Sequence, residues 1–106
     1  MAVIKWRKQA WSLFNQYVDH ARIEYGDKTA RKWLTETSLI YDRLQKHPLS
    51  YTPESLLKDK RHTYRSCHIM RRFKLVYYYA SKSDTVYIRD VWDTKMNPTS
   101  LRNRLK

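Results

Sequence analysis

The chain has 106 residues, of which 14% are aromatic and only one is glycine. This length and composition suit one domain over residues 1–106 with a modest core, and they exclude a disordered segment. The formal net charge of +12 favours an acidic partner, of which nucleic acid is the commonest. With a single cysteine and no long apolar run, we expect a cytoplasmic protein that has no disulfide and does not enter a membrane.

The first half of the sequence predicts a strand and two helices. Residues 3–6 (VIKW) are β-prone. One helix face then follows in Ala10, Phe14, Tyr17, Val18, Ala21 and Tyr25, and a second in Ala30, Trp33, Leu34, Thr37, Tyr41 and Leu44. Gly26 is expected to end the first helix in a left-handed conformation, and Asp27 to cap the second, which ends at His47 and Pro48. So short a connection makes the helices an antiparallel hairpin.

The second half predicts strands. Residues 48–58 contain two prolines and are expected to form a loop, whereas residues 64–69, 73–80 and 86–92 are rich in aromatic and β-branched residues. Leu101 and Leu105 allow a helical turn in the tail. The predicted fold is α+β: an N-terminal strand, an antiparallel two-helix hairpin, and a three-stranded antiparallel meander. One face of its sheet packs on the helices and the other can stay open.

Positive charge gathers in the strand half, where the net charge is +8 in residues 51–106 against +4 in residues 1–50. Between residues 58 and 74 seven basic residues accompany one acid, Asp59. An open basic sheet is a docking surface, although a solvated basic face that only serves solubility is the alternative. The candidate nucleic-acid or target-binding residues are Lys58, Lys60, Arg61, Arg65, Arg71, Arg72 and Lys95.

Other chemistries have weaker support. Cys67 lies in an alternating apolar run, where a buried and inert thiol is expected. His62 and His68 are placed on one strand face with Tyr64 and Ser66, where they would serve either as acid or base or as ordinary surface residues. No metal-ligand spacing and no glycine loop for phosphate is present, so we expect no metal and no cofactor. Trp33 is expected in the core.

The order of elements and several local segments resemble the RelE/ParE superfamily of bacterial toxins from type II toxin–antitoxin pairs. The resemblance is carried by residues 64–66 (YRS), 73–79 (FKLVYYY), 86–93 (VYIRDVWD) and 97–98 (NP). Residues 74–77 (KLVY) match the family's run of a basic residue, two hydrophobic residues and a tyrosine. An unrelated basic α+β domain with the same order is the alternative reading.

This resemblance implies a growth-inhibiting toxin of the plasmid-stabilization type, neutralised by an antitoxin encoded beside it. Such an antitoxin would be acidic and partly disordered, and would fold on contact with this basic chain. Exposed apolar surface on the helical hairpin or the sheet edge would receive it.

The resemblance leaves the target open between the ribosome with its mRNA and DNA gyrase. RelE-like members cut mRNA without a metal, using basic residues and a tyrosine or histidine in the tail. The candidate catalytic residues for such an endoribonuclease are Lys60, Arg61, Arg65 and His68. However, Ile69 stands where those enzymes have a phosphate-binding arginine, and the tail after Tyr87 has neither tyrosine nor histidine.

ParE-like members act on gyrase and need no catalytic set, so the sequence slightly favours gyrase. Two further alternatives stay open. One is a non-toxic basic nucleic-acid-binding module, and the other is an inactive family member that only binds its antitoxin.

Overall fold

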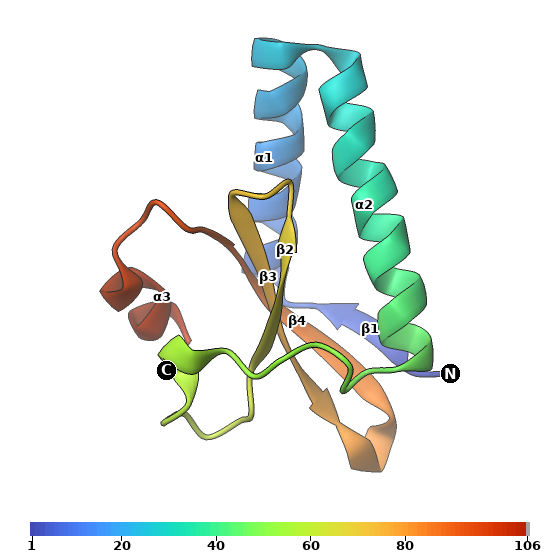
Figure 1. The fold of residues 1–106 in the computed structure, drawn as a ribbon, viewed down its shortest axis with the longest axis vertical. Coiled ribbons are helices and arrows are strands. Elements are labelled where there is room, and N and C mark those ends of the chain that lie inside the picture. The colour runs from blue at the N-terminus through green and yellow to red at the C-terminus, as the bar shows by residue number, and fades with distance from the viewer. Residues whose placement is uncertain (106) are drawn as a thin grey trace.

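The chain folds into a helical hairpin packed on a four-stranded sheet (Figure 1). The computed structural model describes residues 1–105. The helices and strands, in chain order, are β1 (Val3–Trp6), α1 (Lys8–Tyr25), α2 (Asp27–Lys46), β2 (Arg65–Ile69), β3 (Phe73–Ala80), β4 (Thr85–Asp93) and α3 (Pro98–Arg104). Short 3-10 turns lie at Ser55–Leu57 (η1) and Ser81–Ser83 (η2). Every element predicted from the sequence is present, and the α+β fold class is confirmed.

The two predicted apolar stripes form the inner faces of the hairpin, with local corrections. Phe14 and Trp33 are buried at 3% exposure, but Tyr25 and Leu34 are exposed, and Ile40 is buried in place of Leu34. The helical period continues through both stripes, yet the hairpin tip extends beyond the sheet in Figure 1, so the end of α1 has little to pack against.

The connection between α1 and α2 differs from the prediction at both residues. Gly26 has φ 98° and ψ 175°, which is a positive-φ conformation but not the left-handed helical one. Its N–H donates to the Arg22 carbonyl at 3.0 Å. Asp27 is the first residue of α2 rather than its cap, and its side chain makes no capping hydrogen bond. Glycine is still required here, because other residues rarely adopt such a φ.

The sheet has the order β1-β4-β3-β2. The antiparallel meander of β2, β3 and β4 is confirmed, but β1 pairs in parallel with β4 and makes the sheet mixed. Since β3 occupies one edge of β4, the N-terminal strand fills the other edge, with Val3 opposite Thr85 and Trp6 opposite Ile88. Among residues 1–105, no helix is long and apolar enough to span a lipid bilayer.

The sheet has a core on each face, which corrects the expectation of an open second face. The hairpin covers one face, where Leu75, Tyr77, Ile88 and other side chains are fully buried. On the opposite face, α3 and η1 cover a second cluster formed by Leu57, Tyr64, Val76, Trp92, Leu101 and Leu105. Four-residue spacing places Leu101 and Leu105 on one side of the tail, so the tail packs on the sheet.

The connection between β2 and β3 turns without glycine. Met70 and Arg71 have φ values of 53° and 61°, which are uncommon for residues with a side chain. The Met70 N–H donates to Glu36 Oε1 on α2 at 2.8 Å. Contact with the hairpin therefore holds a turn that local sequence does not favour.

Candidate functional site

The predicted basic residues do not form one patch, because the fold distributes them over three places. Lys58 and Lys60 follow η1. Arg61 and Arg65 line a hollow beside the ends of β2 and β3. Arg71, Arg72 and Lys95 lie around the β2–β3 turn and the end of β4.

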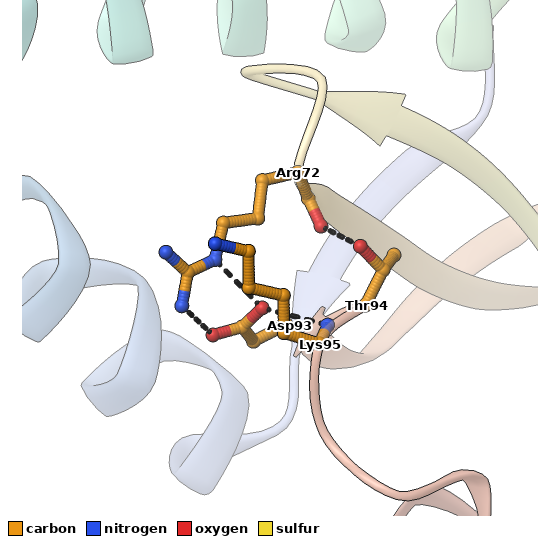
Figure 2. A network of polar contacts seen from close by, with 4 residues as sticks. All are labelled: Arg72, Asp93, Thr94 and Lys95. Carbon is orange, nitrogen blue, oxygen red and sulfur yellow. Dashed lines mark hydrogen bonds and ion pairs between the residues drawn. The ribbon is translucent and has the colours of Figure 1, made fainter.

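Arg72 is engaged by Asp93 at the end of β4 (Figure 2). Its Nε donates to Asp93 Oδ1 at 2.8 Å and its Nη2 to Oδ2 at 2.5 Å. The Lys95 backbone N–H donates to the same carboxylate, and the Thr94 hydroxyl donates to the Arg72 carbonyl. Hydrogen bonds from Arg72 hold the pKa of Asp93 below its ordinary value. The Arg72 charge is therefore already paired with a carboxylate of the same chain.

Lys74 is also neutralised within the fold. Its Nζ lies 2.6 Å from Oε1 of Glu54, and the Ser66 hydroxyl donates to the same oxygen at 2.9 Å. Burial raises the pKa of Glu54, but hydrogen bonds from the Leu56 N–H, Lys74 and Ser66 outweigh it and leave this pKa below its ordinary value. His68 is exposed and lies opposite Lys74 in the strand register. The lysine beside His68 is thus already paired with a carboxylate.

The tail arginines are paired in the same way. Arg102 donates to both oxygens of Asp59, at 2.8 and 2.6 Å, and Arg104 lies 3.0 Å from the buried Asp90. Hydrogen bonds from Arg102 lower the pKa of Asp59 to about 2. Both pairs hold α3 against the rest of the fold.

Arg61 and Arg65, in contrast, take part in none of the ion pairs within residues 1–105. They line a hollow of about 390 Å³, together with Leu49, His62, Thr63, Tyr78, Tyr79 and Ser81. Arg65 Nη1 donates to the Tyr51 carbonyl at 2.8 Å, which fixes the guanidinium against the loop before η1. This arginine pair is the part of the predicted set whose charge faces a cavity without a carboxylate partner.

The predicted histidine face is only partly formed. His62 precedes β2 and stacks flat on Tyr78, with ring centroids 3.8 Å apart and planes 3° apart. Burial, assisted by Arg61 and Arg89, lowers the pKa of His62. His68 lies near the other end of β2, so the two histidines do not converge on one site.

A larger cleft, which sequence reasoning missed, lies between the hairpin and the β2–β3 turn. This aromatic cleft has a volume of about 580 Å³ and is lined by residues that include Tyr17, Tyr25, Trp33, Met70 and Phe73. The Phe73 ring contacts Tyr17 and Trp33, at centroid distances of 4.7 and 4.9 Å. The Arg72–Asp93 pair is part of its polar lining, together with Gln16, His20 and Thr29. Its residues come from α1, α2, the β2–β3 turn, β3 and β4, so only the aromatic content of each element could have pointed to it.

The remaining candidate groups are structural. Cys67 is buried, and burial raises the pKa of its thiol to about 12, as expected for an inert cysteine. Trp33 lies in the core as predicted. In the part of the chain that the structure describes, no three His, Cys, Asp or Glu side chains are grouped to hold a metal ion.

Comparisons with known proteins define the fold. No protein-family model and no curated protein sequence matches the chain. Its structure is similar to a solved chain described as "Chromosomal ParDE TA system from P. aeruginosa", with a TM-score of 0.66. The two are 16% identical, and the match covers 88% of this chain and 96% of that chain. The chain therefore has a ParE-like fold, and the resemblance to the RelE/ParE superfamily indicated by the sequence is confirmed at the level of the fold.

Proposed function

We propose that the chain is the toxin of a type II toxin–antitoxin pair and inhibits bacterial growth until its antitoxin binds. The structural similarity to the ParDE chain, over nearly the full length of both, carries the proposal. The net charge of +12 supports it, since an acidic antitoxin segment would relieve the self-repulsion of so basic a domain.

A ParE-like action on DNA gyrase is favoured over mRNA cleavage. Phosphoryl chemistry on RNA needs cations aimed at the developing charge of the transition state. Arg61 and Arg65 are in no ion pair within residues 1–105, so two such cations are available. The tail arginines, however, are bound to Asp59 and Asp90, and the tail after Tyr87 has neither a tyrosine nor a histidine to act as the acid. Binding of a protein target needs a complementary surface and no such acid.

The aromatic cleft is the docking place we propose for the antitoxin. Tyr25 on its wall is 73% exposed, so part of the aromatic surface of the cleft faces solvent. Arg31 and Lys32 on the adjoining part of α2 are exposed as well. An acidic amphipathic segment would bury the apolar residues and meet these charges.

Induction of the chain alone in a bacterial host tests the function, with translation, transcript integrity and the DNA damage response followed in parallel. Filamentation with a DNA damage response and intact transcripts is the expected result. An immediate stop of translation with cut transcripts would show that the target is mRNA and not gyrase. A His68→Ala variant would then test the catalytic role of His68. Normal growth would refute the toxin proposal.

The docking place is tested by co-expressing the product of a short acidic reading frame that adjoins this gene. We expect it to restore growth, and we expect Tyr25→Asp to abolish this rescue without reducing toxicity. Leu39→Asp is the matched control, because Leu39 is 68% exposed on α2 and does not line the cleft. Equal rescue of the unchanged chain, Tyr25→Asp and Leu39→Asp would show that the antitoxin docks outside the aromatic cleft.

A further inference from the structure

We propose that the hollow at Arg61 and Arg65 binds single-stranded nucleic acid. In this arrangement the two arginines hold phosphates and the stacked rings of His62, Tyr78 and Tyr87 receive a base. The inference concerns binding by the isolated chain and does not depend on toxicity.

Within residues 1–105, the phosphate side of the site is formed by residues that have no acidic partner. None of the eight residues that line the hollow is acidic. The carboxylate beside it, Asp84, accepts a hydrogen bond from the Tyr79 hydroxyl at 2.7 Å. Because one nitrogen of Arg65 is held by the Tyr51 carbonyl, the guanidinium is oriented before a ligand arrives. The hydroxyls of Thr63 and Ser81 add neutral donors for phosphate oxygens.

The base side of the site is a column of stacked rings across three segments. His62 lies flat on Tyr78, and Tyr78 stacks on Tyr87 of β4, with centroids 5.2 Å apart and planes 27° apart. Tyr64 meets both His62 and Tyr78 edge-on and props the column from the side. Burial, assisted by Arg61 and Arg89, lowers the pKa of His62 and so favours the uncharged form of this flat ring. Nucleic-acid bases stack on such surfaces with little sequence preference.

A β-bulge brings a third arginine to the column. Val76 pairs with Asp90, and the next residue, Tyr77, pairs with Ile88, so Arg89 is the extra residue of β4. The Arg89 guanidinium carbon lies 5.9 Å from the centre of the Tyr78 ring, and its buried Nε has no hydrogen-bond partner within residues 1–105. Bulges often redirect a side chain toward a functional site, and this one places positive charge behind the rings.

Single strands are favoured over duplexes for a geometric reason. A base in a duplex has both faces covered by its neighbours, whereas a single-stranded base can turn onto an aromatic ring. The proximity of Arg61 and Arg65 to His62 and Tyr78 in one hollow allows phosphate and base of the same strand to be held together.

The test is fluorescence anisotropy of the full-length chain with labelled ten-nucleotide DNA and RNA strands of one sequence, and with the DNA duplex. We expect single strands to bind roughly ten-fold more tightly than the duplex. Arg61→Ala/Arg65→Ala should weaken binding by roughly ten-fold and reduce the slope of log K against log salt by about 1.4, which corresponds to two phosphates. His62→Ala should weaken binding and leave this slope unchanged. Comparison of DNA with RNA shows whether the 2′-hydroxyl is sensed.

Lys8→Ala/Lys28→Ala is the matched control, because it removes the same charge from exposed positions near the starts of α1 and α2. We expect it to bind like the unchanged chain. An equal loss in both double variants, no preference for single strands, or no binding at 50 mM salt would overturn the proposal. If circular dichroism shows Arg61→Ala/Arg65→Ala to be unfolded, Arg61→Gln/Arg65→Gln replaces it and keeps the side-chain length.

Discussion

Lys74 Nζ lies 2.6 Å from Oε1 of Glu54, a residue of the loop before η1 that is only 3% exposed. The pair joins the start of β3 to the segment before η1. Ser66 on β2 donates to the same carboxylate, so the contact fixes three segments at one point. A lysine that the sequence places in a run of free positive charge is thus part of the internal structure.

Replacing Glu54 by glutamine should destabilise the fold by about 3 kcal/mol at pH 7, since it leaves Lys74 without its charged partner. The folded pKa of Glu54 lies below its ordinary 4.5. Its contribution is therefore present above pH 4.5 and is lost as the pH falls through the folded pKa. In urea denaturation between pH 3 and 7, the free energy of unfolding of Glu54→Gln should fall less at low pH than that of the unchanged chain. Asp42→Asn is the control, because its pair with Lys46 is exposed and contributes little.

Trp33→Ala should cost about 3–5 kcal/mol, because its large side chain fills the space between the hairpin and Phe73. Chemical denaturation measures this loss. Trp11→Ala is the matched comparison, since Trp11 is 49% exposed and should change stability much less. A folded Trp33→Ala chain as stable as Trp11→Ala would contradict the packing described for α2.

Cys67 should resist thiol reagents in the folded chain at pH 8, because its pKa of about 12 leaves almost no thiolate and the side chain is buried. Labelling with an aromatic disulfide reagent, followed by absorbance, should be fast only in denaturant. Rapid labelling under native conditions would mean that β2 opens readily or that the thiol is exposed.

Arg61→Ala/Arg65→Ala should abolish growth inhibition while leaving the far-ultraviolet circular dichroism unchanged. Both arginines face the hollow and neither is in an ion pair within residues 1–105, so their removal breaks no internal ion pair and costs one hydrogen bond, from Arg65 to the Tyr51 carbonyl. Colony counts after induction measure the effect, with Lys8→Ala/Lys28→Ala as the control. Full toxicity in a folded double variant would exclude this hollow from target binding, whatever its affinity for oligonucleotides.

Sequence periodicity by itself determined the elements of this protein. The change from a three-to-four-residue period before Pro48 to alternation after Tyr64 separates the hairpin from the meander, and Gly26 marks the break between the helices. These features depend on neighbours in sequence, and local patterns record them. The same patterns identified Trp33 and Cys67 as buried residues.

Only the tertiary structure decided which charges are free. Glu54, Asp93 and Asp59 take up the charges of Lys74, Arg72 and Arg102 across sequence separations of 20, 21 and 43 residues, which no local pattern contains. The parallel pairing of β1 with β4 and the packing of α3 on the sheet are likewise contacts between distant segments. Coulomb attraction and burial act on spatial neighbours. The sequence could therefore count the positive charges, whereas the fold selected Arg61 and Arg65 as the pair that faces a cavity.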